Sequence, residues 1–352
     1  MNKNIAQLLA SNRTLIVAEM SSNHCQSIKK AIKLVDEAKK AGADALKLQT
    51  FKPESLALKQ IGNNNAFKKV VKWKNFKNRY ELFEKAYLPW EWHKKIFQRA
   101  KKINLPIFSS PFDLDAVDFL EKLKCPAYKI ASPEITDIPL IEKVAKTGKP
   151  IIISLGLAQE KDINLAVKTL KKNKCKKFIL LKCLAHYPAD PNLLNLKTIP
   201  LIKKKYKCDV GFSDHTIDSA SAITAVSLGA SMIEKHFKLK NDNKSLDHFF
   251  SMDTAEFKKM VEDIRIAEKA MGKMTLKLDK QTKKNLSGRK SIYISKEITK
   301  GSIINKDNIK IVRPFDGLHP KYYNLVLGKK VNRKLKYGTP LKLTYLNLKK
   351  IK

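Results

Sequence analysis

The sequence predicts a parallel α/β barrel followed by a smaller β-rich module, and three observations carry this prediction. Eight short, nearly continuous apolar runs recur through residues 14–237, which is typical of parallel strands covered on both faces. Helical patterns separate these runs. Thirdly, polar side chains follow the C-terminal end of most of these apolar runs. Eight such units in about 260 residues indicate a (β/α)8 TIM barrel, and an open doubly wound sheet is disfavoured because no G-x-G-x-x-G motif follows the first run.

The first four predicted strands each deliver polar groups at or just past their ends. They cover residues 14–19, 45–49, 106–110 and 127–131. Between the second and third, residues 51–86 form a basic, aromatic insertion that we expect to be a loop over the active face. The polar side chains are Glu19, Lys47, Gln49, Ser110, Lys129, Ser132 and Glu134.

The last four predicted strands repeat the design and add two imidazoles. They cover residues 150–154, 178–183, 210–215 and 230–236, and their polar residues are Ser154, Ser213, His215, Glu234 and His236. Parallel neighbours lie roughly 5 Å apart, so His215 and His236 would leave one edge of the sheet together. A lone histidine would be explained by a hydrogen bond at the strand end. A charged cluster at a buried strand end is costly unless it binds something, so we predict that the pair shares a divalent metal.

The length and the C-terminal pattern predict two domains. A chain of 352 residues exceeds the size at which single cores stop growing. The barrel pattern ends near Gly272, so we expect a catalytic barrel over 1–272, a Lys-rich linker over 273–290, and a module over 291–352. That module is too small to hold much core by itself, and we expect it to pack on something.

Composition excludes several classes of function. The net charge of +38 comes mostly from lysines scattered over predicted helices without interleaved aromatic residues, so we interpret it as a solvated basic surface and expect no nucleic-acid partner. Five cysteines without a C-x-x-C pair predict reduced thiols. No apolar run approaches the ~20 residues of a membrane span. We therefore expect a cytoplasmic protein without membrane contact.

The carboxyl ends of the strands in a barrel converge on one opening, here called the mouth, and the residue types predicted there indicate which substrates it would bind. Two lysines with several serine hydroxyls form a cationic ring rich in donors, which suits a small phosphorylated acid such as an enol phosphate. A metal on the histidines would polarise the carbonyl of a second substrate. Glu134 and Glu19 are candidates for proton transfer or for holding sugar hydroxyls. These residues predict a metal-assisted condensation of an anionic donor with a polar carbonyl compound.

Six segments resemble the motif set of the sialic acid synthase family, and the resemblance covers nearly the whole chain. They are residues 16–24 (IVAEMSSNH), 45–51 (ALKLQTF), 108–113 (FSSPFD), 128–135 (YKIASPEI), 211–216 (GFSDHT) and 232–237 (MIEKHF). Residues 291–350, with Arg313, are similar to that family's small antifreeze-like (SAF, β-clip) domain. Residues 89–93, 134–139 and 250–253 look most like the pseudaminic acid synthases within the family.

The resemblance implies condensation of phosphoenolpyruvate with an open-chain acetamido sugar, a divalent metal (Mn, Mg or Co) and a domain-swapped homodimer. Glu134 resembles the carboxylate that activates water or transfers a proton, and Glu19, Lys129, His215 and His236 join it as catalytic candidates. By position, the family's contacts to phosphoenolpyruvate correspond to Lys47, Ser110, Lys129, Ser132, Ser154 and Ser213. The residues that resemble sugar contacts are Glu19, Tyr187, Asp247 and Arg313. The residues that resemble the metal ligands are His215 and His236.

Two departures from the family pattern leave alternatives open. Leu184 and Ala185 stand where family members carry Thr then Asn or Ser, so a contact from that loop is missing. Residues 246–250 (LDHFF) combine features of the neuraminate and pseudaminate enzymes. An N-acetylneuraminate or legionaminate synthase is therefore the alternative within the family. A catalytically inactive barrel that binds sugar or phosphate is the alternative from another class.

Overall fold

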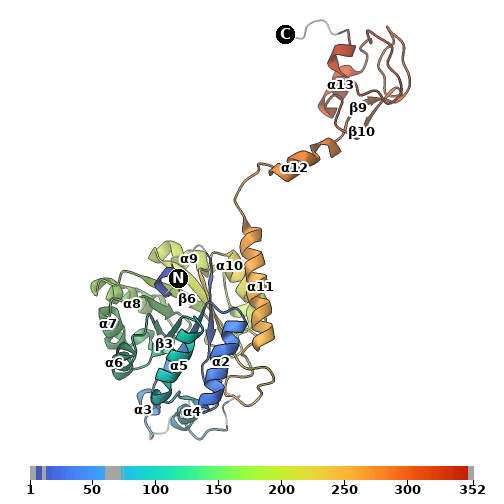
Figure 1. Ribbon diagram of the computed structural model, residues 1–352. Helices are drawn as coiled ribbons and strands as arrows, with labels where there is room; N and C mark the ends of the chain where they lie inside the picture. Colours follow the sequence, from blue (N-terminus) through green and yellow to red (C-terminus); the bar gives the residue numbers. More distant parts are fainter. Residues whose placement is uncertain (1–4, 10–12, 60–72, 74, 348–352) are drawn as a thin grey trace. The chain divides into compact units, whose positions relative to one another are not determined.

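The computed structural model describes residues 5–9, 13–59, 73 and 75–347, in two compact units (Figure 1). The units are Met1–Gly272 and Lys273–Lys352. None of the helices in the described ranges has the length and apolar character needed to cross a membrane.

The first unit is a closed barrel of eight parallel strands in chain order, which confirms the predicted fold. β1 pairs with both β2 and β8, and the register places Glu19 beside Lys47 on one side and His236 on the other. The strands are β1 (Leu15–Glu19), β2 (Ala45–Thr50), β3 (Ile107–Pro111), β4 (Tyr128–Ile130), β5 (Ile151–Ser154), β6 (Phe178–Cys183), β7 (Asp209–Asp214) and β8 (Met232–His236).

Amphipathic helices surround the strands (Figure 1). In α2, Ala31, Leu34, Val35 and Ala38 recur at helical spacing and are buried, while Lys33 between them is exposed. The main helices are α2 (Ile28–Lys40), α5 (Trp90–Lys102), α6 (Leu114–Lys122), α7 (Ile138–Lys146), α8 (Glu160–Lys172), α9 (Thr198–Tyr206), α10 (Ala220–Ser227) and α11 (Thr254–Met271), and shorter ones are α1 (Ile5–Leu9), η3 (Pro133–Thr136) and η4 (Pro191–Leu193).

The insertion predicted as a loop over 51–86 is partly helical. It contains α3 (Pro53–Leu56) and α4 (Arg79–Ala86), whereas 60–72 and 74 lie outside the described residues. Asn78 caps α4 by accepting a hydrogen bond from the Glu81 N–H, which is why the chain turns helical there. Trp73 donates its Nε1 hydrogen to the Leu246 carbonyl at 3.2 Å. This part of the insertion therefore contacts the loop that follows β8.

The second unit has a small core of its own, built around a two-stranded antiparallel sheet. β9 (Ser291–Ile294) pairs with β10 (Ile309–Val312), and short turns η6 (Pro320–Tyr322), α13 (Tyr323–Val326) and η7 (Leu343–Tyr345) complete it. The core residues include Ile292, Ile304, Val326, Val331 and Leu341. The segment predicted as a linker over 273–290 contains α12 (Lys280–Lys284) and η5 (Asn285–Gly288) in its second half. Asp279 caps α12 through its side chain, which explains the local helix.

Candidate active site

Two lysines and two carboxylates are buried together at the carboxyl ends of the barrel strands. Lys47 Nζ lies 2.6 Å from Glu19 Oε2 and 3.5 Å from Glu234 Oε1. Lys129 Nζ lies 3.0 Å from the same Glu234 oxygen. All four side chains are at most 4% exposed. Pairing lowers the cost of burying each charge, and the cluster as a whole is close to neutral before any substrate enters.

Burial and ion pairing shift the pKa values of these lysines and carboxylates in different directions. Burial raises the pKa of Glu19, and Lys47 offsets this only in part. Burial also raises the pKa of Glu234, but Lys129 and Lys47 outweigh it, so its pKa falls. The pKa of Lys129 is lowered, chiefly by burial, although Glu234 opposes the change. An arriving anion would favour the charged form of Lys129, so this amine is suited to holding a phosphate or carboxylate.

The serine hydroxyls at the mouth differ in their partners. Ser110 Oγ accepts from Lys47 Nζ at 3.3 Å, and Ser132 Oγ accepts from the Gly156 N–H at 3.0 Å. Ser213 Oγ donates to Glu234 at 3.3 Å. Ser154 Oγ is buried without a hydrogen-bond partner in the described part of the chain. Ser110 and Ser154 therefore keep a hydroxyl hydrogen available for an oxyanion, whereas the Ser132 hydroxyl also forms a hydrogen bond with Cys183.

The two predicted metal ligands lie side by side, with ring centroids 5.4 Å apart. The His215 Nδ1 contacts the Leu184 carbonyl at 2.9 Å, and a carbonyl can only accept, so Nδ1 carries the hydrogen and Nε2 presents its lone pair. The His236 Nδ1 is buried and has no hydrogen-bond partner among the described residues. Burial and then His215 hold the pKa of His236 well below its usual value, so this ring is neutral.

These features fit a metal held by two imidazoles. Within the described ranges, no group of three His, Cys, Asp or Glu side chains is arranged to hold an ion, so water and substrate oxygens would supply the other ligands. Burial is the largest influence on His215 and lowers its pKa, but the Cys183 sulfur, 4.0 Å from Nδ1, the Leu184 carbonyl and Asp214 together raise the pKa above its usual value. A bound cation would oppose that protonation.

Asp247 ties the loop after β1 to the histidine pair. Its Oδ2 accepts from Ser21 Oγ at 2.5 Å and from Ser22 Oγ at 2.9 Å, and it lies 3.9 Å from His236 Nδ1. Glu19 Oε1 accepts from the Ser21 N–H at 3.0 Å. The two carboxylates therefore sit on either side of one short loop, where they can accept from the hydroxyls of a polyol.

An aromatic wall stands beside the histidines. The Tyr187 ring lies 4.4 Å from His215, and the Phe250 ring lies 4.6 Å from His236 and 4.9 Å from Tyr187. Trp73 extends the wall, with its ring 6.0 Å from Tyr187. A substrate here meets polar groups on one side and apolar rings on the other, which suits a sugar that carries methyl groups.

Glu134 lies in η3, directly after β4, and has an unusual environment. Its Oε2 is buried and lacks a hydrogen-bond partner within the described residues. Burial raises its pKa to about 7, against the lowering effect of Lys129 and Lys47. A carboxyl that titrates near neutral pH is suited to general acid or base chemistry.

The sequence predicts the lysines, serines and histidines of the candidate active site, but it assigns no role to Glu234, the carboxylate at the centre of the lysine cluster. Glu234 was singled out only as a polar strand end, yet it links Lys47, Lys129 and Ser213. The signal was the parallel register, which sets Ser213 directly beside Glu234. The sequence analysis includes Phe250 only within motif segments and predicts no contact for its side chain. Arg313 is exposed and belongs to the second unit.

A closed barrel whose carboxyl end gathers paired lysines, free hydroxyls and two imidazoles belongs to the TIM-barrel enzymes that act on small anionic substrates. Residues 34–275 match the NeuB family and residues 289–345 match the SAF domain. The chain belongs to the NeuB family, the phosphoenolpyruvate-dependent nonulosonic acid synthases. The expected family and antifreeze-like domain are thereby confirmed.

Relatives within the family are similar over almost the whole chain. A pseudaminic acid synthase of Campylobacter jejuni is 42% identical over 94% of this chain and 96% of its own length. An N,N'-diacetyllegionaminic acid synthase of the same species is 38% identical over 90% of this chain and 95% of its own. The crystal structure of an N-acetylneuraminic acid synthetase from Leptospira borgpetersenii, in complex with citrate, superposes with a TM-score of 0.69 at 29% identity, covering 78% of this chain and 90% of that one.

Proposed function

We propose that this chain is a pseudaminic acid synthase. It would condense phosphoenolpyruvate with an open-chain 2,4-diacetamido-2,4,6-trideoxy hexose of the altrose type, giving a nine-carbon nonulosonic acid and phosphate. The observation that carries the proposal is the 42% identity, over 94% of the chain, to the Campylobacter pseudaminic acid synthase, against 38% for the legionaminic acid synthase of that species. The aromatic wall of Trp73, Tyr187 and Phe250 supports a 6-deoxy sugar, whose C6 is a methyl group.

The residues at the mouth divide between the two substrates. Lys47 and Lys129 hold the phosphate and carboxylate of phosphoenolpyruvate, with hydroxyl donors from Ser110 and Ser154 and further contacts from Ser132 and Ser213. Glu19, Tyr187 and Asp247 face the sugar. Phosphoenolpyruvate thus meets two buried ammonium groups, in surroundings where charge interactions are stronger than in water.

The reaction balances as one sugar, one phosphoenolpyruvate and one water. C3 of the enol forms a bond to the aldehyde carbon, and the aldehyde oxygen takes a proton to become a hydroxyl. Water adds at C2, and Glu134, whose pKa of about 7 suits the task, removes its proton. The bond between C2 and the phosphate-bridging oxygen then breaks, phosphate leaves with that oxygen and takes up the proton of the new C2 hydroxyl, and C2 becomes a ketone carbon.

His215 and His236 would hold the divalent metal, which we propose to be Mn, Mg or Co. When bound, the ion supplies Lewis-acid polarisation of the aldehyde oxygen. The chain's own contribution is orientation. The Leu184 carbonyl fixes the tautomer and ring plane of His215, and Phe250 packs on His236 at 4.6 Å.

Phosphate release tests the proposal. The purified chain is mixed with phosphoenolpyruvate, a divalent metal and, in turn, the acceptors of pseudaminate, legionaminate and neuraminate enzymes. We expect the highest kcat/KM with the altrose-type acceptor and no phosphate without a sugar. A catalytically inactive binding barrel would release none with any acceptor. A higher kcat/KM with another acceptor would assign the chain to that branch of the family.

A further inference from the structure

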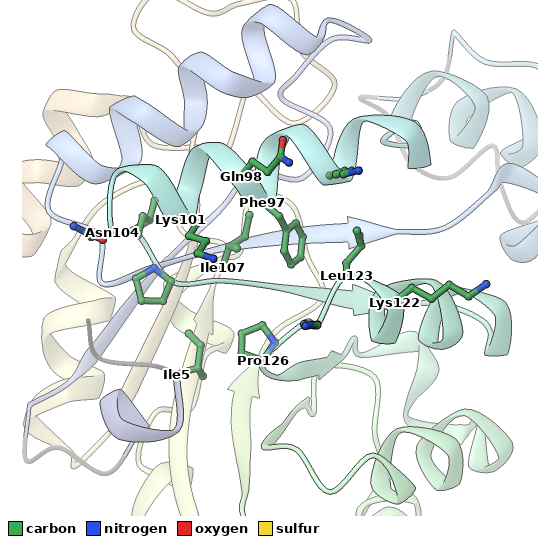
Figure 2. A pocket seen from close by; sticks show the side chains of 13 residues that line it. Ile5, Phe97, Gln98, Lys101, Asn104, Ile107, Lys122, Leu123 and Pro126 are labelled. Atoms are coloured by element: carbon green, nitrogen blue, oxygen red, sulfur yellow. The ribbon is translucent and has the colours of Figure 1, made fainter. Parts of the chain in front are cut away.

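A groove with a cavity volume of about 770 Å³ lies between α5 and α6 (Figure 2). It is lined by Ile107, the first residue of β3, and by Pro126, which precedes β4. The candidate active site lies at the other ends of the same strands, where Ser110 and Lys129 are found. The groove is therefore on the opposite end of the barrel from the mouth.

The base of the groove is apolar. Ile5, Leu105 and Ile107 are almost completely buried there. Phe97 of α5 and Leu123, which follows α6, also line the groove (Figure 2), and both are half-buried. The volume falls in the range of small-molecule sites, ~300 to 1,000 Å³. Covering the exposed part of these side chains with an apolar group would be favourable.

The rim of the groove is cationic. Lys94, Lys101 and Lys124 line it and are exposed, and none of the described residues that line it is acidic. Lys101 also lies in the last turn of α5, where a cation stabilises the helix dipole. That explanation does not extend to Lys94, near the middle of the helix, or to Lys124, in the following loop. Lys122 extends away from the groove in Figure 2 and is left out of the rim.

We propose that this groove binds a small amphiphilic anion, with an apolar body between Phe97 and Leu123 and one carboxylate, phosphate or sulfonate at the lysine rim. The apolar residues lie at the base and the lysines at the edge, so the occupant is a free molecule that enters the groove. A membrane surface would instead need apolar side chains that protrude beyond the charged ones. The site is separate from the synthase reaction.

The test is a fluorescence titration of the full chain with 8-anilinonaphthalene-1-sulfonate, a planar apolar probe with one sulfonate. The double variant Lys94→Glu/Lys101→Glu should weaken binding about tenfold or more, because it loses charge-assisted contacts. The matched control is Lys95→Glu/Lys102→Glu, which changes two exposed neighbours on the same helix by the same charge. It should stay within about twofold of the wild type, since exposed charges that do not touch the probe are screened.

A second variant tests the apolar base. Leu123→Trp places a larger side chain in the groove and should abolish the fluorescence increase, while phosphate release from phosphoenolpyruvate stays unchanged. Decanoate should displace the probe, and decanol at the same concentration should not. Equal weakening in the two double variants, or displacement by decanol as effective as by decanoate, would overturn the proposal. Loss of co-sedimentation with phosphatidylglycerol vesicles in Lys94→Glu/Lys101→Glu, with probe binding intact, would assign the patch to a membrane instead.

Discussion

At the scale of single residues, the buried lysines of the barrel have two distinct tasks. Lys47 and Lys129 form ion pairs with Glu19 and Glu234 in the candidate active site. Lys235 lies on the opposite face of β8 from Glu234 and His236, and its Nζ donates to Asp214 Oδ2 at 2.8 Å and to the Thr216 carbonyl at 2.6 Å. Alternation along a strand predicts this division, because adjacent side chains face opposite sides. The first two are substrate-binding groups in our account, and Lys235 is structural.

The different roles of Lys47, Lys129 and Lys235 predict different effects when each is replaced by methionine. Lys47→Met and Lys129→Met should each raise the KM for phosphoenolpyruvate by about tenfold or more, because each removes a charge-assisted contact worth ~1.5 to 3 kcal/mol. Lys235→Met should leave that KM unchanged and lower the free energy of unfolding by ~3 to 5 kcal/mol, since Asp214 is left buried and unpaired. Steady-state kinetics and denaturant unfolding measure both. An unchanged KM in the first two variants would refute their role.

Glu134 gives a prediction about pH. Burial raises its pKa to about 7, and the ionised form is the base, so kcat/KM should fall as pH drops below about 7. Glu134→Gln should remove this limb of the profile and lower kcat by about 10²-fold or more. A wild-type profile that is flat between pH 6 and 8, or a variant that retains the limb, would assign the proton transfer to another group.

At the scale of elements, the loop after β5 shows how backbone space sets a site. A Cβ on Gly156 would lie 2.9 Å from both Cys183 Sγ and Ser132 Oγ. Gly156→Ala should therefore displace Ser132 and raise the KM for phosphoenolpyruvate several-fold. Gly288→Ala is the matched control, because nothing lies within 4 Å of its Cβ position. A crystal structure of the Gly156→Ala variant with Ser132 unmoved and normal kinetics would contradict this reading.

The elements also show what the sequence could predict. The barrel followed from the strand repeat, and the histidine pair followed from parallel register, since both depend on backbone geometry alone. The helices α4 and α12 were not predicted because they have only 8 and 5 residues, too few for a clear apolar period, and their caps Asn78 and Asp279 are the local signals. The groove beneath α5 could not be predicted, because it depends on the distance between two helices.

At the scale of the whole molecule, the second unit raises the question of what it serves. Its core is small, and we propose that it completes the site of a partner subunit by placing Arg313 over the sugar. Mixing Arg313→Ala with Glu134→Ala chains, each inactive alone, should restore part of the activity, because a mixed dimer contains one site with both residues. Well-formed mixed dimers without activity, verified by sedimentation, would show that the module serves its own barrel or none.

The measurement that tests the central claim most directly is an internal competition. The wild-type chain, phosphoenolpyruvate and metal are incubated with equal amounts of the altrose-type diacetamido sugar and the acceptor of the legionaminate enzymes, and the nonulosonic acids formed are resolved by NMR. Competition reports the ratio of kcat/KM values and is independent of the amount of active protein. Our account predicts pseudaminic acid as the dominant product. A mixture dominated by the legionaminic product, or phosphate release without either acid, would contradict it.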